Sequence, residues 1–318
     1  MSFSSILRSF SFVCAVGLST VLTGCPGEKP DTKVPEPEQS LDDAYALLPG
    51  SAIAVGTVDA RAFFANPHAG NDIAKMVEKF MPIGTEAGFS VGRDVDRIVF
   101  GSYSYQGIDV SAIVVGRFDS AKIKQVAASQ SPTKAGVPLV VSSYAGRDVY
   151  TVNNVGFTLL SDTKAIVGTE NGIRRVLDRI KDRRVKRDLA GWMIGTLDTA
   201  GAAFAVAADF ASQPMPAEAI QQVPKELTTG LKAMRAVGQF KDGVQVAGSL
   251  TYAEPTNAEQ SAEVIKKTAS YSRLLAFIGI QIKNFDVKVE KNDVQVTVGI
   301  DDQSLRILLT NVPAMLGK

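Results

Sequence analysis

The sequence has little of the chemistry that metal sites and enzymes require. Among its 318 residues are two cysteines, Cys14 and Cys25, and a single histidine, His68. A zinc site built from histidine and cysteine is therefore excluded beyond Cys25. Nucleophile-elbow, P-loop, dinucleotide-binding and EF-hand motifs are also absent from the sequence. We therefore expect no metal, no cofactor and no enzymatic activity.

Long hydrophobic runs are absent as well. The most apolar stretch, residues 10–22, has about 13 residues, whereas a helix needs roughly 20 to span a bilayer. Arg8 precedes this stretch and small residues end it. A basic start, a short apolar core and a small-residue end are typical of a secretory signal peptide. We therefore predict that residues 1–24 are a signal peptide.

The end of this segment, Leu22-Thr23-Gly24-Cys25, resembles the lipobox of bacterial lipoproteins. The resemblance implies cleavage between Gly24 and Cys25 and conversion of the Cys25 thiol to a diacylglyceryl thioether, with a further chain such as palmitate on the freed amine. Two or more acyl chains hold a protein firmly at a membrane, because each buried methylene contributes about 0.8 kcal/mol. The mature chain would have no free thiol, and the loss of Arg8 would change its net charge from +1 to 0.

Residues 25–42 are predicted to form the lipidated cysteine and a tether. Prolines and acidic residues dominate this stretch: Pro26, Glu28, Pro30, Asp31, Pro35, Glu36, Pro37 and Glu38. Such a composition cannot bury enough apolar surface to fold, and it favours an extended chain. In many two-membrane bacteria an aspartate directly after the lipidated cysteine retains a lipoprotein at the inner membrane. Proline occupies that position here, which favours the outer membrane, on its periplasmic or surface face.

The remainder of the chain contains a weak internal repeat. Residues 98–129 and 236–270 both show a strand, a glycine-containing turn, a second strand, a polar break and an amphipathic helix. With their flanks, both halves follow the order strand, helix, hairpin, helix, hairpin, helix. We predict an α+β fold of two similar halves, each a mainly antiparallel sheet with helices packed on one face. The expected domains are residues 43–190 and 191–318.

Alternating apolar and polar residues in 294–298 predict a strand with one solvent-exposed face.

Three motifs of the first half, Leu47-Leu48-Pro49, Val58-Asp59 and Val167–Asp178, resemble those of an uncharacterised family of exported bacterial proteins. The resemblance extends over about residues 43–190. It implies a fold and an exported setting, and it implies no catalytic residue.

The strongest charge feature is the segment from Ile173 to Arg187, in which eight basic and two acidic residues give a net charge of +6. Its apolar residues recur at helical spacing and predict a helix with one packed face and a basic remainder. One interpretation is a contact with anionic lipid headgroups or an acidic partner. The other is a solvated helix end with partial ion pairs. Nucleic acid is not expected, because the mature chain is neutral overall and exported. The candidate contact residues are Arg174, Arg175, Arg179, Arg183, Arg184 and Arg187.

Few other side chains are candidates for a site. Asp59 and Asp209 end corresponding strands, either as paired acids lining a cleft or as caps of the helices that follow. Tyr103 and Tyr105 would share one face of a sheet, as a ligand surface or as cross-strand packing. Trp192 is expected to seal the two halves together. His68 is interpreted as a surface or capping residue.

These features favour a non-catalytic lipoprotein of the cell envelope that offers a binding or scaffolding surface. Two alternatives stay open. One is a periplasmic carrier or chaperone for lipid or other apolar cargo, and the other is a hydrolase that uses two carboxylates. The expected partners are the membrane, through the lipid anchor, and a protein or lipid of the envelope. The oligomeric state does not follow from the sequence.

Overall fold

The computed structural model describes residues 40–67, 70–78, 81, 83–106, 108–133, 136–152, 154–221, 223–240, 243–270 and 280–307. The chain divides into two compact units, Met1–Glu38 and Gln39–Lys318, and the described residues all belong to the second. The predicted signal peptide, the lipidation site at Gly24 and Cys25, most of the tether and His68 lie outside the described residues.

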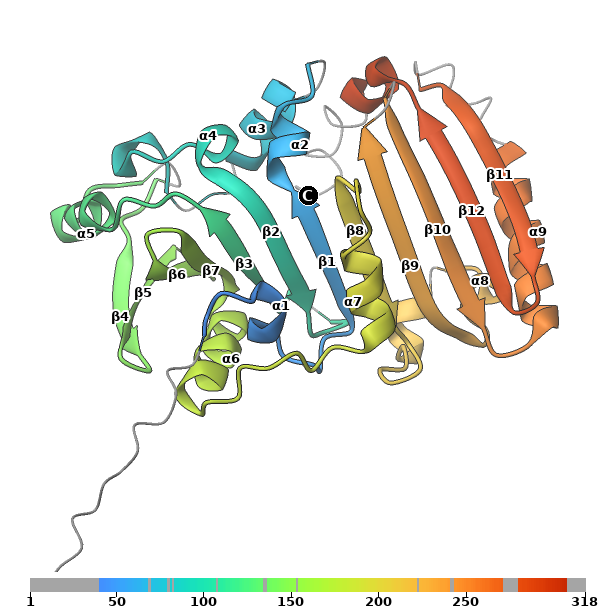
Figure 1. The fold of residues 1–318 in the computed structure, drawn as a ribbon, viewed down its shortest axis with the longest axis horizontal. Helices are drawn as coiled ribbons and strands as arrows, with labels where there is room; N and C mark the ends of the chain where they lie inside the picture. Colours follow the sequence, from blue (N-terminus) through green and yellow to red (C-terminus); the bar gives the residue numbers. More distant parts are fainter. Residues whose placement is uncertain are drawn as a thin grey trace, which may run out of the picture. The chain divides into compact units, whose positions relative to one another are not determined.

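The body is built on one twelve-stranded sheet (Figure 1), in which the strand order is β11-β12-β10-β9-β8-β1-β2-β3-β7-β6-β5-β4. Each strand runs antiparallel to its neighbours. The strands are β1 (Ala54–Asp59), β2 (Val95–Ser102), β3 (Val110–Gly116), β4 (Val140–Tyr144), β5 (Arg147–Val152), β6 (Val155–Ser161), β7 (Lys164–Thr169), β8 (Phe204–Asp209), β9 (Leu231–Phe240), β10 (Val244–Tyr252), β11 (Ile282–Glu290) and β12 (Asp293–Ile300).

The two halves of the chain repeat one strand order. In the first half β1-β2-β3-β7-β6 are neighbours, and in the second half β8-β9-β10-β12-β11 follow the same pattern. The predicted α+β class with antiparallel pairing is therefore confirmed. The β4–β5 hairpin extends the first half beyond this shared pattern.

The halves do not form two separate sheets, because β1 and β8 pair with each other along five residues, from Ala54–Ala208 to Val58–Phe204. Alone, each half would leave the backbone groups of its first strand without sheet partners, and buried N–H and C=O groups require partners. Joining the two strands satisfies both edges at once. The division into domains at residues 43–190 and 191–318 stays a prediction.

Helices cover the two faces of the sheet unequally. The helices are α1 (Ala44–Leu47), α2 (Ala60–Phe64), α3 (Gly70–Glu78), α4 (Val91–Asp94), α5 (Ser120–Ser129), α6 (Glu170–Lys181), α7 (Gly191–Leu197), α8 (Lys225–Thr228) and α9 (Pro255–Ser270), with 3-10 turns at Thr85–Ala87 and Ala217–Ile220. We call the face that carries α1, α6 and α7 the α7 face, and the opposite one the α9 face. Figure 1 shows α7 in front of β8 and α9 behind β11 and β12.

The first half departs from the expected one-sided packing, since it buries both faces. Val99 and Ile113 pack with α6 and α7 on the α7 face, whereas their neighbours Ile98 and Val114 pack with α2 and α5 on the α9 face. In strands β2 and β3, apolar residues occur at both odd and even positions, so both faces of each strand are apolar. Strands of this kind are usually covered on both sides. In the second half, Val294 and Val296 of β12 pack under α9 while Gln295 and Thr297 are exposed on the α7 face. This is the predicted single wet face.

Helix α6 has the predicted amphipathic packing. Its Ile173, Val176 and Leu177 are fully buried against the sheet. Thr169 caps the helix, because its hydroxyl accepts a hydrogen bond from the Gly172 amide at 3.2 Å. Among the described residues, no helix is sufficiently long and apolar to span a membrane.

Candidate functional site

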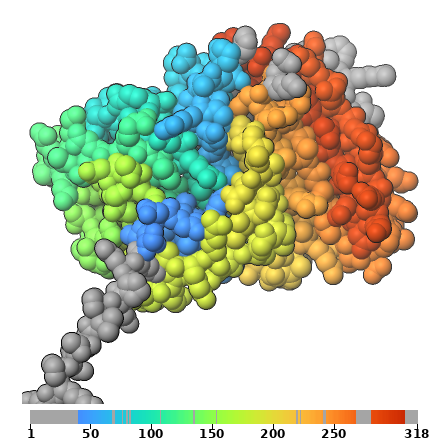
Figure 2. Space-filling view, in the orientation of Figure 1, coloured from blue at the N-terminus to red at the C-terminus, as the bar shows by residue number. Residues whose placement is uncertain are grey.

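The main candidate site is an open groove on the α7 face of the second half. It lies between α7 and the uncovered strands β9, β10 and β12, and its volume is about 550 Å³. Figure 2 shows α7 standing beside the flatter surface of these strands. We call it the α7 groove. Its lining residues are Trp192, Gly195, Thr196, Thr199, Arg235, Ala236, Val237, Ala247, Gly248, Ser249, Gln295, Val296 and Thr297.

The floor of the groove consists of two rows that cross three strands. Sheet register places Arg235 opposite Ser249 and Ser249 opposite Gln295, which gives a polar row. The Arg235 Nε donates a hydrogen bond to the Ser249 hydroxyl at 3.0 Å, and the Gln295 amide nitrogen donates to Glu290 at 3.0 Å. The next row contains Val237, Ala247 and Thr297. The floor is therefore polar at one end and has small side chains at the other.

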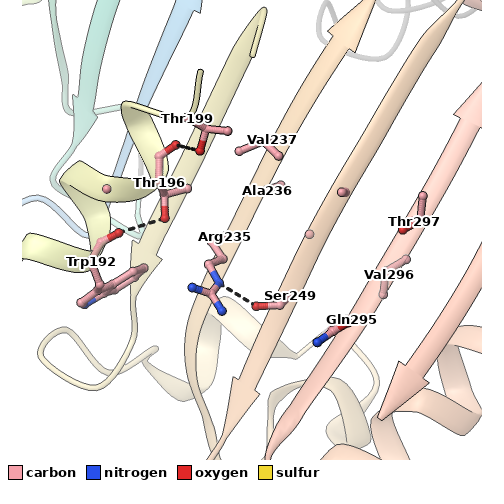
Figure 3. Close-up of a pocket in the computed structure, with 13 residues that line it drawn as sticks. Trp192, Thr196, Thr199, Arg235, Ala236, Val237, Ser249, Gln295, Val296 and Thr297 are labelled. Atoms are coloured by element: carbon pink, nitrogen blue, oxygen red, sulfur yellow. Dashed lines mark hydrogen bonds between the residues drawn. The ribbon is translucent and has the colours of Figure 1, made fainter. Parts of the chain in front are cut away.

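Helix α7 supplies the wall (Figure 3). The Thr196 hydroxyl donates to the Trp192 carbonyl at 2.9 Å, and the Thr199 hydroxyl donates to the Thr196 carbonyl at 2.8 Å. Trp192 is 36% exposed, and its ring lies on the same side of the groove as the Arg235 guanidinium. The expectation that Trp192 seals the two halves is thus corrected, since its side chain lines an open surface.

The groove continues past the end of α7. A second hollow of about 190 Å³ shares Thr199, Val237, Ala247 and Thr297 with the first and reaches the segment 200–202. The two hollows form one trough along α7 and the segment 199–202 that precedes β8.

The basic segment lies elsewhere, and the structure gives its arginines internal partners. Arg179 is only 4% exposed. Its guanidinium donates to the Asp188 carboxylate at 2.8 Å, to the Lys186 carbonyl at 2.8 Å and to the Ala46 carbonyl at 3.1 Å. The hydrogen bond from Arg179 to the carboxylate holds the pKa of the Asp188 carboxyl below its usual range. Arg179 therefore connects α1 to the end of α6. Because its side chain is buried, the prediction that it contacts an external partner is wrong.

The exposed arginines of the segment also form ion pairs. Arg174 pairs with Glu170 and Arg175 with Asp109, both at 2.5 Å, Arg184 pairs with Asp182 at 2.8 Å, and Arg187 pairs with Asp43 at 2.6 Å. Arg183, directly after the helix, has a left-handed backbone with φ of 55°. This arrangement agrees with the second interpretation, a helix end with ion pairs. A contact of these side chains with an anionic partner stays a prediction.

Tyr45 connects this ion-pair cluster to α7. The guanidinium groups of Arg97 and Arg187 each lie 5.3 Å from the centre of its ring. Its hydroxyl donates to Asp198 at 2.8 Å, directly after α7. Burial raises the pKa of the Tyr45 hydroxyl to about 12, and the bond to Asp198 acts in the same direction. The neutral phenol is therefore part of how α1 docks.

This shift predicts a loss of stability in alkali. Because the folded pKa of Tyr45 is raised, its contribution is complete below the unfolded pKa of about 10 and disappears as pH rises through about 12. We expect the free energy of unfolding to fall across this window and to fall less steeply in Tyr45→Phe, as measured by urea denaturation at several pH values. Parallel curves for the two proteins would contradict this role.

The remaining candidates do not converge. Antiparallel pairing of β1 and β8 places Asp59 and Asp209 at opposite ends of the pair. Asp59 caps α2 through the Ala62 amide at 3.1 Å, and Asp209 accepts from the Ser212 hydroxyl at 2.8 Å. The interpretation of Asp59 and Asp209 as paired acids that line one cleft is therefore wrong. Among the described residues there is no group of three or more histidine, cysteine or acidic side chains that could hold a metal ion.

Tyr103 and Tyr105, the two candidate tyrosines, have internal partners. The Tyr103 hydroxyl lies 3.2 Å from the Ser111 hydroxyl, and the Arg175 guanidinium lies 5.2 Å from the Tyr103 ring centre. The Tyr105 hydroxyl donates to the Gln213 carbonyl. These contacts agree with packing rather than with a ligand surface.

The chain is similar to known proteins in its fold only. No protein-family model matches the chain, and no curated protein matches it. In fold, the chain is similar to TP0453. Crystal form III of TP0453 matches 85% of this chain and 99% of its own with a TM-score of 0.51 at 12% identity. Crystal form I matches 86% and 98% with a TM-score of 0.51 at 10% identity. At these identities the likeness supports the α+β fold alone.

Proposed function

We propose that this chain is a lipid-anchored, non-catalytic binding module of the bacterial cell envelope. Its anchor is Cys25, and its binding surface is the α7 groove. The groove carries the proposal, because it combines an exposed aromatic ring, one guanidinium and neutral hydrogen-bonding groups on a face of the sheet that helices leave open. Concave sites with a few convergent polar groups are the usual places for ligands.

The lining favours binding over catalysis. General acid–base chemistry requires a group that exchanges protons near neutral pH, such as histidine or a perturbed carboxylate. The described residues that line the groove include no histidine, cysteine, aspartate, glutamate or lysine. A guanidinium group has N–H donors and no acceptor, and it does not release a proton in proteins. These side chains can orient a ligand, and none of them can move its protons.

The lining also favours polar cargo over lipid. A carrier of acyl chains needs an enclosed apolar cavity, whereas this groove is open and has Arg235, Ser249 and Gln295 on its floor. The buried clusters of the first half consist of packed side chains on both faces of the sheet. The carrier hypothesis therefore has less support than a surface binding module. Placement at the outer membrane rests on the residue after Cys25 and is part of the proposal.

The anchor is tested by metabolic labelling with an acyl precursor and intact mass. We expect label on the native protein and on Cys14→Ser, which changes the other cysteine, and no label on Cys25→Ser. Label is the appropriate readout because an uncleaved signal segment could itself hold the variant at a membrane. An unlabelled native protein, or a labelled Cys25→Ser variant, would rule out the anchor.

The binding role is tested through the groove itself. The chain contains one tryptophan, Trp192, so its intrinsic fluorescence reports on this site. Purified envelope lipid, glycan and protein fractions are titrated into a protein of residues 25–318 that is produced without the signal peptide and carries Cys25→Ser. At least one fraction is expected to shift the emission to shorter wavelength and to saturate. If no fraction changes the emission, the groove is not a binding surface.

A further inference from the structure

The charge of the α7 groove points to an anionic group on its ligand. Arg235 is the one charged residue among the described lining residues. Its Nε is occupied by the Ser249 hydroxyl at 3.0 Å, and this bond fixes the orientation of the guanidinium plane. Among the described residues it forms no ion pair. The terminal nitrogens of such a fork match the two oxygens of a carboxylate.

The aromatic wall indicates the other part of the ligand. Trp192 is 36% exposed beside Arg235, so its indole offers a rigid apolar face within reach of a charged group. Aromatic rings combine large contact area with directional polar contacts at their edges. The C–H face of a sugar ring packs well on such a surface, while its hydroxyls remain free to bond elsewhere.

The floor supplies partners for those hydroxyls. Ser249 and Thr297 offer hydroxyl groups, and Gln295 retains its amide oxygen as an acceptor because its nitrogen bonds to Glu290. Ala247 and Gly248 also line the floor, and because they carry a methyl group and no side chain, they leave space for a ring above the sheet. This mixture of neutral donors and acceptors suits a polyhydroxylated ligand. It offers little to an acyl chain.

The position of the groove argues against an extended peptide. Peptides that add to a sheet bind at an edge strand, where backbone groups are free. The groove lies on the face of β9, β10 and β12, and β9 and β10 are paired on both sides, as is β12. Their backbone groups are therefore occupied by the sheet. Recognition here depends on side chains, which again favours a sugar.

We propose that the α7 groove binds a saccharide that carries a carboxylate. The sugar ring lies against Trp192, the carboxylate pairs with the Arg235 guanidinium, and the hydroxyls bond along the row of Ser249 and Gln295. The adjoining hollow near Thr199 leaves room for a further sugar, so the ligand is an oligosaccharide. This inference rests on the proposed binding function and specifies its ligand class.

The test compares two disaccharides that differ in one carboxylate. The probes are N-acetylglucosaminyl-N-acetylmuramic acid, which carries a lactyl carboxylate, and N,N′-diacetylchitobiose (hereafter chitobiose), which is neutral. Each is titrated into the Cys25→Ser protein of residues 25–318 while Trp192 emission and heat are recorded. We expect the acidic probe to bind at least tenfold more tightly, and the difference to shrink with salt because it depends on a charge pair.

Variants separate the two contacts. Arg235→Gln is expected to reduce affinity for the acidic probe about tenfold or more and to leave chitobiose unchanged. Trp192→Ala, followed by calorimetry, is expected to weaken both probes about tenfold. Arg184→Gln, an exposed arginine outside the groove, is the matched control and should change neither. Equal binding of the two probes, or an unaffected Arg235→Gln variant, would overturn the proposal.

Failure of the ligand class and failure of the binding function give different results. If neither disaccharide binds while an envelope protein or lipid fraction still shifts Trp192 emission, the saccharide assignment is wrong and the binding module stands. Tighter binding of a carboxylate-bearing tripeptide than of the acidic disaccharide would have the same meaning. If no fraction shifts the emission, both proposals fail.

Discussion

Arg179→Ala is expected to lower the free energy of unfolding by about 1.5–3 kcal/mol, because it removes a buried guanidinium whose hydrogen bonds include one to a carboxylate. Arg179 is 4% exposed, and its guanidinium bonds to Asp188, to the Lys186 carbonyl and to the Ala46 carbonyl. Truncation leaves three acceptors without their donor at the junction of α1 and α6. The loss is measured as a shift of the urea midpoint, with Trp192 emission as the probe.

Two further variants make this prediction specific. Arg184→Ala removes an exposed pair with Asp182 and is expected to cost no more than about 0.5 kcal/mol. Asp188→Asn keeps a hydrogen-bonding side chain beside Arg179 and provides a milder variant if Arg179→Ala does not fold. Equal losses for Arg179→Ala and Arg184→Ala would show that the buried cluster does not fasten α1.

The same cluster should give an acid dependence. The hydrogen bond from Arg179 lowers the pKa of Asp188 in the folded state. The pairing therefore stabilises the fold above the unfolded pKa of about 3.9, and this contribution is lost as pH falls through the folded pKa. The wild-type protein should lose more stability than Arg179→Ala between neutral and strongly acidic pH.

Gly172→Ala is expected to destabilise the protein by about 1–3 kcal/mol, although alanine is the better helix former by about 1 kcal/mol. Gly172 lies in the first turn of α6, where the helix approaches β3. A Cβ at this position would overlap the Val110 carbonyl oxygen, and that atom belongs to a paired strand that cannot easily move. Relief requires a shift of α6 as a whole.

Gly195→Ala is the matched control. This glycine also lies in a helix, α7, but a Cβ there meets no atom within 4 Å. The substitution should therefore stabilise the protein by roughly 0.5–1 kcal/mol through helix propensity alone. Opposite signs for the two substitutions are the expected result, read from urea midpoints. A gain at Gly172 equal to that at Gly195 would contradict the close approach of α6 to β3.

The strand pattern was predictable because it is local. Alternation at 294–298 identified β12 and its wet face, and that face became the floor of the α7 groove. The internal repeat predicted a common order of elements along the two halves of the chain, and in the sheet the two halves also share one strand order. The period of two in a strand determines which side chains share a face, and it can be read without knowing the neighbouring strand.

The site was not predictable in the same way. Trp192, Arg235, Ser249 and Gln295 are far apart in the sequence, and none of them belongs to a motif. Pairing of β9 with β10 and of β10 with β12 brings the last three into one row, and α7 adds the wall. The arginine-rich segment was misleading for a related reason, since its partners include Asp43 and Asp109, which lie 144 and 66 residues away.

By itself, the sequence determined the α+β class, the repeated order of strands and the wet face of the second half, and it predicts the lipid anchor at Cys25. Only the tertiary structure decided that β1 and β8 join both halves into one sheet, that Arg179 is buried, and that a groove forms beside α7. The reason is that hydrophobic period and turn chemistry act over a few residues, whereas ion-pair partners and concave surfaces depend on which distant strands and helices become neighbours.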